Sequence, residues 1–253
     1  MNSIELAPIQ GIPEVRPGDD LSELISSALA ASNLHLTEND ILAVAQKIVS
    51  KAEGRYVHLS GIEPSAEAVR IAKRDGRDAR LVEVVLRESN EVVVASERAL
   101  IVEHRSGAVC AHGGVDRSNL TGEEDVVLLL PEDADASARK LREELGRREG
   151  VHPAVLIVDT QGRAFRSGVV GVAIGCAGLE PVVDLRGASD RAGQPLEITQ
   201  VAQADEVAAA ASVVMGQAAE GIPAALIRGF SYHRGEGPAT RLYRPKKEDL
   251  FRR

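Results

Sequence analysis

Residues 110–119 read CAHGGVDRSN, and the end of this stretch groups four kinds of polar side chain. They are the acid, guanidinium, hydroxyl and carboxamide of Asp116, Arg117, Ser118 and Asn119. The glycines Gly113 and Gly114 precede them, and because glycine adopts positive φ without steric cost, the loop can bring its backbone against a ligand. An apolar run at 99–102 predicts a strand upstream that would support the loop. A plain surface turn is the alternative, so the stretch gains meaning only beside a second one, VDTQGR at 158–163.

The bulk composition excludes several classes of protein. The chain has 253 residues, 44% hydrophobic and 27% charged, as in an ordinary soluble globular protein. A net charge of −8 argues against a nucleic-acid binder, and 2% aromatic residues weaken any case for base stacking. Neither a signal peptide nor an apolar run of about 20 residues is present, so we expect a cytoplasmic protein with no membrane partner. A cluster of basic residues near the C-terminus is expected to be a solvated tail rather than a phosphate-binding surface.

The hydrophobic pattern predicts an α+β fold. Strands are expected at 4–8, 41–45, 91–96, 99–102, 108–111, 126–130, 155–158, 182–185 and 224–227. Helices are expected from 21 onward, after a cap at Asp19-Asp20, and at 65–75, 79–89, 135–148 and 200–215. These elements alternate irregularly, which favours mixed and antiparallel sheets over a doubly wound sheet. We expect one unit over residues 1–253, with two closely packed subdomains whose boundaries the sequence does not mark.

Carboxylates at two predicted strand ends are the main candidates for chemistry. Asp116 and Asp159 would each follow an apolar strand. Two carboxylates about 4 Å apart repel by about 4 kcal/mol at an effective dielectric constant of 20, so a shared site needs a proton or a divalent cation. Mg²⁺ and Mn²⁺ prefer such oxygen ligands, to which Thr160 and Gln217 could add neutral oxygens. Spacing alone does not show that these residues meet.

Other candidate groups keep two interpretations. Lys47, Lys51 and Arg55 follow the predicted strand at 41–45 and are either solvated charges or a phosphate clamp. His112 is either a solvated loop histidine or a functional one. The common nucleotide, zinc and nucleophile motifs are absent from the sequence.

Six stretches, taken in order, resemble the coenzyme F420-0:gamma-glutamyl ligase family. They are QKIVSKAEGR (46–55), CAHGGVDRSN (110–119), VDTQGR (158–163), VAIGCAG (172–178), DLRGASDRAG (184–193) and ADEVAAAASVVMGQAAEGIP (204–223). The likeness runs from about residue 8 to the C-terminus, and its specificity lies in the ordered set rather than in any one piece.

The resemblance implies an amide ligase that depends on GTP and on Mg²⁺ or Mn²⁺. Members of the family add L-glutamate to the phospholactyl carboxylate of a deazaflavin coenzyme precursor, and then further glutamates through γ-linkages. GTP would convert the carboxylate to an acyl phosphate, which the glutamate amine attacks, so no protein nucleophile is required. The implied fold is a two-domain α+β subunit in an intertwined homodimer, with nucleotide and metals at the dimer interface.

The resemblance also implies a set of site residues. The metal ligands would be Asp116, Asp159, Thr160 and Gln217. The nucleotide contacts would be Gly11, Ile12, Pro13, Gln46, Lys47, Lys51, Asn119, Met215, Gly216, Gln217 and Gly221. The residues acting directly in the chemistry would be Asp116, Asp159 and Lys51.

Two stretches depart from the family's pattern. Residues 111–114 read AHGG where the family has Ala-Asn-Ala-Gly, and residues 168–171 read GVVG in place of a more polar Gly-Gln-Thr-Asp-like stretch. We expect these departures to affect acceptor recognition more than nucleotide chemistry. Two alternatives therefore remain: the same chemistry on a different carboxylate acceptor, or a non-catalytic nucleotide-binding relative.

Overall fold

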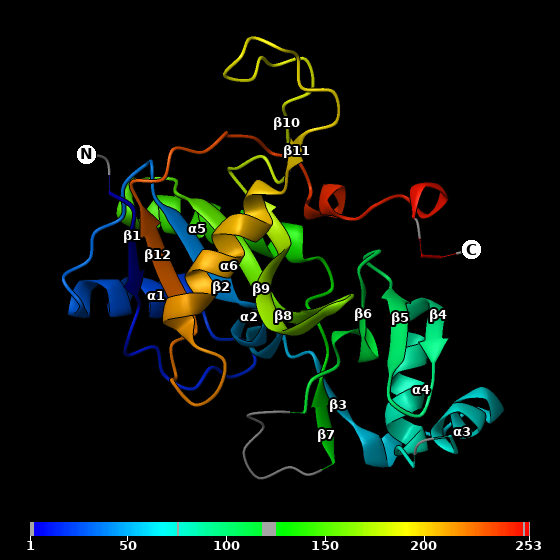
Figure 1. Cartoon of the computed structure of the whole chain (residues 1–253). Coiled ribbons are helices and arrows are strands. Elements are labelled where there is room, and N and C mark those ends of the chain that lie inside the picture. Colours follow the sequence, from blue (N-terminus) through cyan, green and yellow to red (C-terminus); the bar gives the residue numbers. More distant parts are fainter. Residues whose placement is uncertain (1–2, 75, 118–124, 250, 253) are drawn as a thin grey trace.

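A five-stranded sheet forms the centre of the protein, in a computed structural model that describes residues 3–74, 76–117, 125–249 and 251–252 (Figure 1). In spatial order its strands are β1 (Glu5–Pro8), β12 (Ala224–Arg228), β2 (Ile41–Ala45), β8 (Ala154–Arg163) and β9 (Arg166–Ala177). Strands β2 and β8 are parallel, whereas the other neighbouring pairs are antiparallel. We call this the main sheet.

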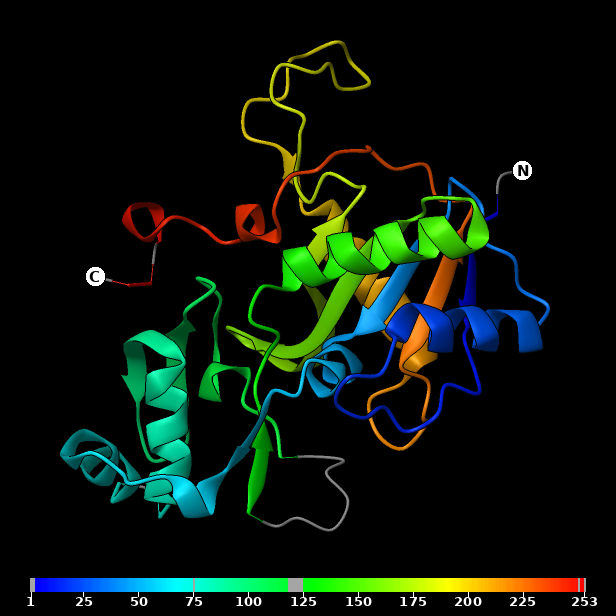
Figure 2. The same ribbon diagram turned by 180° about the vertical axis from the view of Figure 1, so that it is seen from behind.

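Helices cover both faces of the main sheet. Helices α1 (Leu21–Ala31), α2 (Gln46–Ala52) and α5 (Ala134–Glu149) share one apolar cluster with the first face, and α6 (Gln203–Met215) shares another with the second (Figures 1 and 2). The central strands β2 and β8 are accordingly apolar on both sides, as in a buried parallel pair.

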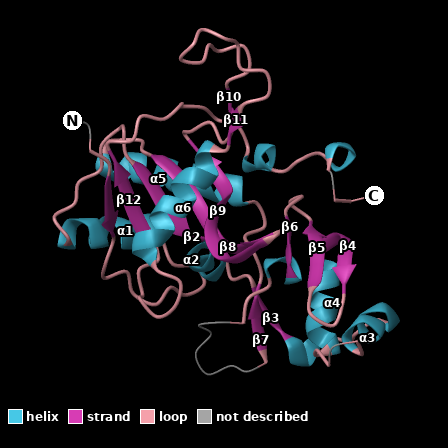
Figure 3. Cartoon of the chain, in the orientation of Figure 1, coloured by secondary structure: helices cyan, strands magenta, loops and turns pink. Residues whose placement is uncertain are grey.

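The insert, residues 56–117 and 125–128, leaves the main sheet after α2 and returns before α5 (Figure 3). Its elements are β3 (Tyr56–His58), α3 (Ala66–Ala72), α4 (Ala79–Arg87), β4 (Ser89–Ala95), β5 (Leu100–His104), β6 (Val109–Ala111) and β7 (Val126–Leu128). Strands β4, β5 and β6 form an antiparallel sheet, and β3 pairs with β7. Two apolar clusters of its own stabilise the insert.

Shorter elements complete the described chain. They are β10 (Val183–Asp184), β11 (Gln200–Val201) and the 3-10 turns Leu59–Gly61, His112–Gly114, Ala239–Leu242 and Lys246–Glu248. In the part of the chain that the structure describes, no helix has the length and apolar character needed to cross a membrane.

Strands β8 and β9 continue beyond the main sheet as a long hairpin that curves toward β6 of the insert (Figure 1). We call residues 159–172 the arm. A β-bulge at Ile174 changes which face β9 presents, so that Gly171 faces α6 while Gly175 faces α5. A Cβ at Gly171 would lie 2.5 Å from the Ala208 carbonyl oxygen, and the glycine therefore permits close packing of α6 on the sheet.

The structure confirms the α+β class with mixed and antiparallel sheets. Three expectations were wrong. The strand predicted to end at 158 continues to Arg163, residues 200–201 are a strand rather than the start of α6, and Arg252 is not part of a solvated tail, since its side chain is only 10% exposed. The two-domain subunit and the intertwined homodimer stay predictions.

Candidate active site

The carboxyl ends of the parallel strands β2 and β8 meet at one edge of the main sheet. Ala45 pairs with Val158, so Gln46 and Asp159 follow at the same level. The loop after α6 reaches this edge too, because the Ala45 amide donates to the Pro223 carbonyl at 2.8 Å. Ligands in sheets of this kind commonly bind beyond the carboxyl ends of parallel strands.

A groove of about 750 Å³ opens at this edge, lined by residues of the arm and of β6 of the insert. The main sheet, α2 and the arm contribute Ala45, Gln46, Lys47, Val158, Asp159, Thr160, Gln161, Gly162, Arg163 and Ala164, and the loop after α6 contributes Gln217. The insert contributes Ile101, Val109, Cys110, Ala111, Gly114, Val115 and Asp116. The structure therefore brings Asp116 and Asp159 to one groove from elements far apart in sequence.

The two carboxylates lie in different electrostatic surroundings. Burial raises the pKa of the Asp159 carboxyl above its ordinary value, and the charge of Asp116 adds to this rise. Hydrogen bonds from Gln161 and the Thr160 amide, together with the charge of Lys47, act in the opposite direction. The Lys47 Nζ lies 2.7 Å from Asp116 Oδ2, so an ammonium already balances part of the acidic charge.

Neutral oxygens gather on the other side of the arm. Thr160 pairs with Gly171 and faces α6, where its Oγ1 donates to Gln217 Oε1 at 2.8 Å. Gln217 follows Gly216, which ends α6 with φ of 76° and turns the chain toward the groove. Asp159 and Thr160 thus leave adjacent positions of β8 on opposite faces, as a strand's alternation requires, yet both residues and Gln217 line the groove.

A short left-handed turn positions Asp116. His112, Gly113 and Gly114 have φ of 52°, 60° and 68°. Beyond the turn, Asp116 exchanges two backbone hydrogen bonds of 2.9 Å with Leu128 at the end of β7. The backbone of this acid is therefore fixed against a strand.

Several predicted nucleotide contacts lie along the same edge but do not line the groove. Lys51 lies on α2 one helical turn beyond Lys47. Its side chain is buried and forms an ion pair with Glu14. The turn Gly11-Ile12-Pro13 follows β1. Ile9, between β1 and this turn, donates its amide hydrogen bond to the Ala224 carbonyl at the start of β12. Met215, Gly216 and Gly221 flank Gln217 without lining the groove. Asn119 lies outside the described residues.

Comparison with known proteins decides the family. The family model described as F420-0:Gamma-glutamyl ligase matches residues 10–229. The chain belongs to this family. Three relatives, each named coenzyme F420:L-glutamate ligase, come from Methanothermobacter thermautotrophicus (47% identical over 98% of this chain and 99% of the relative), Methanopyrus kandleri (47%, over 99% and 98%) and Archaeoglobus fulgidus (42%, over 99% and 97%). The predicted resemblance is thereby confirmed.

The structure accommodates both departures of this F420-0:gamma-glutamyl ligase family member from the family's pattern. Histidine, like asparagine, is among the side chains found more often at positive φ, which suits the left-handed position 112. At position 171 a side chain would meet the Ala208 carbonyl, so an acid there would require α6 to move.

The donor set of the groove fits a hard divalent cation. Two carboxylates, a hydroxyl and a carboxamide oxygen are the ligand types that Mg²⁺ and Mn²⁺ prefer. Within the described residues, no three histidine, cysteine or acidic side chains form a metal-binding group, so a cation here would rely on neutral oxygens as well. The Lys47 ammonium beside Asp116 supports this fit, because the site already attracts positive charge.

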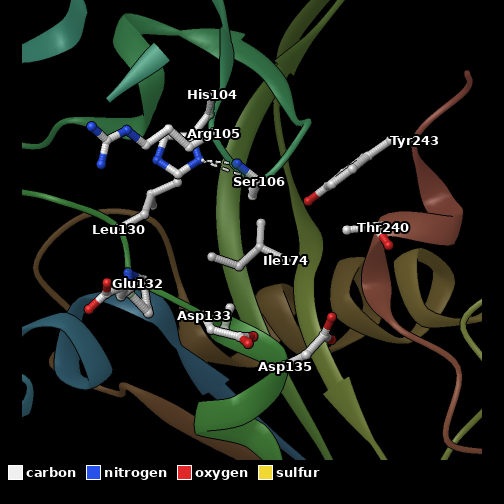
Figure 4. A pocket seen from close by; sticks show the side chains of 12 residues that line it. His104, Arg105, Ser106, Leu130, Glu132, Asp133, Asp135, Ile174, Thr240 and Tyr243 are labelled. Atoms are coloured by element: carbon white, nitrogen blue, oxygen red, sulfur yellow. Dashed lines mark hydrogen bonds between the residues drawn. The ribbon is translucent and has the colours of Figure 1, made fainter. Parts of the chain in front are cut away.

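A second cavity of about 360 Å³ lies between the β5–β6 turn, the start of α5 and the 3-10 turn Ala239–Leu242 (Figure 4). Figure 4 shows the Tyr243 hydroxyl pointing into it and Ser106 bonded to His104. Two of its acids have structural partners: Asp133 caps α5, and Asp135 accepts from the Cys176 amide at 2.8 Å. No predicted site residue lines this cavity, so the groove is the better candidate.

Sequence reasoning missed the apolar side of the groove and Arg163. Ile101, Val109 and Val115 read as ordinary strand or loop residues because their facing depends on where the insert packs. Arg163 belongs to the quoted stretch VDTQGR, but the strand was predicted to end at 158, so the arm and the position of Arg163 on it were not predicted.

Proposed function

We propose that the chain is a GTP- and divalent-metal-dependent ligase that adds L-glutamate to the coenzyme F420 precursor, first at the phospholactyl carboxylate and then through γ-linkages. The relatives' printed names support the glutamate ligation and the coenzyme. The observation that carries the proposal is the meeting of Asp116, Asp159 and Lys47 at the carboxyl ends of β2 and β8.

Each group of the groove has a role in the proposed reaction. Asp116 and Asp159, with Thr160 and Gln217, would hold Mg²⁺ or Mn²⁺, which offsets charge on the transferring phosphoryl group. Lys47 presents a second positive charge beside Asp116 and would orient the nucleotide's phosphates. GTP would transfer its γ-phosphoryl group to the acceptor carboxylate and leave as GDP. The glutamate amine would then attack the acyl phosphate, losing a proton as the amide forms and phosphate leaves.

Both cysteines are unsuited to nucleophilic catalysis. Burial raises the pKa of Cys110, which lines the groove, to about 12, and the charge of Asp159 contributes to the rise. Burial likewise raises the pKa of Cys176 to about 12. Because the thiolate is the reactive form, neither thiol competes with the glutamate amine near neutral pH.

The test is incubation of the purified chain with GTP, Mg²⁺ or Mn²⁺, L-glutamate and the deazaflavin precursor, followed by mass spectrometry. The product mass should rise in glutamate-sized steps, and omission of any one component should stop both this rise and GTP consumption. An unchanged mass with the complete mixture would refute the proposal, and turnover only with other carboxylic acids would favour the alternative acceptor.

A matched pair of variants tests the metal site. Asp159→Asn should abolish turnover, whereas Asp205→Asn should retain it. Asp205 is a suitable control because burial raises its pKa too, yet it lies in the first turn of α6, accepts a hydrogen bond from the Ala173 amide of β9 and does not line the groove. Circular dichroism checks that both variants fold.

A further inference from the structure

The groove has two chemically different parts. One contains Lys47 and the two carboxylates. The other is an apolar wall that the insert forms from Ile101, Val109, Ala111 and Val115. Phosphate groups are not stabilised by contact with apolar surface, so the wall is suited to an apolar part of a ligand.

The wall follows from the alternation of β6. Cys110 points inward and is buried, so Val109 and Ala111 on either side of it point outward. Ile101 of β5 pairs with Ala111 of β6, and the two side chains therefore lie on the same face of the sheet. Val109 is 40% exposed, and a single exposed valine needs no explanation, but several apolar side chains lining one groove are typical of a binding site.

The positively charged side chain of Arg163 belongs to the arm, on the opposite side of the groove from this wall. Asp159, Gln161 and Arg163 occupy alternate positions along β8, and all three line the groove. Arg163 is exposed, and its Nη2 donates to the Ser167 carbonyl at 3.3 Å, a long hydrogen bond that a ligand can replace. A guanidinium pairs with a phosphate through two parallel hydrogen bonds.

We propose that the apolar wall and Arg163 form the acceptor subsite: the deazaflavin ring lies on Val109 and its neighbours, and Arg163 pairs with the acceptor's phosphate group. This inference rests on the proposed function. It assigns the insert to acceptor recognition and leaves the edge formed by α2 and the loop after α6 to the nucleotide. Such an arrangement places the acceptor carboxylate beside Asp116 and Asp159, where its phosphorylation would occur.

The inference is tested by titrating the phospholactyl deazaflavin precursor into the protein without GTP and following the deazaflavin fluorescence. Arg163→Gln should raise the Kd about tenfold, equivalent to about 1.4 kcal/mol. Val109→Ser should also raise it about tenfold, as for lost apolar contact in a binding pocket. The KM for GTP should remain unchanged in both variants.

Two neighbouring residues provide matched controls. Arg166 faces Arg163 across the hairpin, and Val169 is 53% exposed on the same arm, but neither lines the groove. Arg166→Gln and Val169→Ser should leave the Kd within about twofold of wild type, as surface substitutions usually do.

A deazaflavin that lacks the phospholactyl group separates the two contacts. Wild type and Arg163→Gln should bind this analogue equally, whereas Val109→Ser should still bind it more weakly, because only the ring contact remains. Wild-type turnover combined with an unchanged Kd in both variants would overturn the subsite while leaving the proposed function intact. A rise in the KM for GTP instead would assign the wall to the guanine base, and a wild type that does not turn the precursor over would remove the proposed function itself.

Discussion

At the scale of single residues, two aspartates show how surroundings shift the pKa of a carboxyl group in opposite directions. Burial raises the pKa of Asp159, and the neighbouring Asp116 raises it further. The hydroxyl of Ser22 instead lowers the pKa of Asp20 to about 2, with help from Arg148. The ionised form of Asp20 is thus stabilised by its neighbours. The ionised form of Asp159 is disfavoured by burial, which a bound cation would offset. Natural proteins commonly retain such costs at functional sites.

Asp20→Ala should destabilise the protein by about 1 kcal/mol at pH 7, as is usual for loss of a helix N-cap. Asp20 accepts the Glu23 amide and pairs with Arg148 of α5 at 2.6 Å. Because its folded pKa lies below the unfolded value, the charge-dependent part of this stabilisation is present above about pH 4 and is lost as the pH falls toward 2. Urea unfolding at several pH values measures the difference, and Asp20→Asn, which keeps an acceptor oxygen, should lose less at pH 7. An equal deficit for Asp20→Ala at pH 7 and at pH 2 would contradict the charge-based explanation.

Local sequence patterns identified the polar half of the groove but not the direction of every side chain. Asp116, Asp159 and Gln217 stand in polar stretches next to predicted elements, and the structure brings all three to the groove. Lys47 and Lys51 looked equivalent in the sequence. On α2 they are four residues apart, a rise of about 6 Å, and Lys51 pairs with Glu14 instead of lining the groove. Such a difference depends on tertiary packing.

At the scale of elements, the ends of a strand were predicted correctly where its residues are uniformly buried, and wrongly where burial changes along the strand. Strand β2 was predicted with its observed ends, because its five residues are apolar and follow a turn. Strand β8 leaves the core after Val158, and its polar continuation DTQGR resembled a loop. Backbone pairing with β9 keeps this part extended without an apolar pattern to reveal it. The groove depends on this unpredicted arm.

Gly171→Ala should destabilise the protein by roughly 1–3 kcal/mol, as overpacking of an interior does. The new Cβ would lie 2.5 Å from the Ala208 carbonyl oxygen and 2.8 Å from the Ser212 Cβ, and α6 would have to move. Gly162 of the same arm is the matched control, since an added Cβ there meets no atom within 4 Å. Urea unfolding should show Gly162→Ala within about 0.5 kcal/mol of wild type. Equal effects of the two substitutions would show that β-strand propensity, not contact with α6, determines the loss.

At the scale of the whole molecule, the groove exists only because the insert is held against the arm. Asp116 and the apolar wall belong to the insert, whereas Asp159 and Arg163 belong to the arm. Arg55 joins the two parts near α2, through hydrogen bonds to the Leu130 carbonyl and to Glu88. The residues that end the described chain make a second connection across β4 and β5, and Figure 1 shows this segment running above the insert. The relative position of the two carboxylates therefore depends on contacts remote from them.

Arg252→Gln should loosen this second connection. The Arg252 guanidinium pairs with Glu91, Glu103 and Asp249, and its loss would leave three carboxylates close together. Hydrogen bonds between charged groups contribute about 1.5–3 kcal/mol, and partial exposure of the partners places the expected loss in the lower half of that range. Amide hydrogen exchange should become faster in β4 and β5 but not in β2, because β2 is enclosed by the main sheet and its helices.

Activity supplies the second measurement for the same substitution. If the insert positions Asp116 opposite Asp159, a loosened insert should lower kcat of the proposed ligase while the protein remains folded, since a small misplacement of catalytic groups is costly. Lys247→Gln is the matched control, because Lys247 is close in sequence and its side chain is 82% exposed. Faster exchange in β4 and β5 without any change in kcat would mean that the arm and Arg55 hold the groove together on their own, and the Arg252 contacts would then serve stability alone.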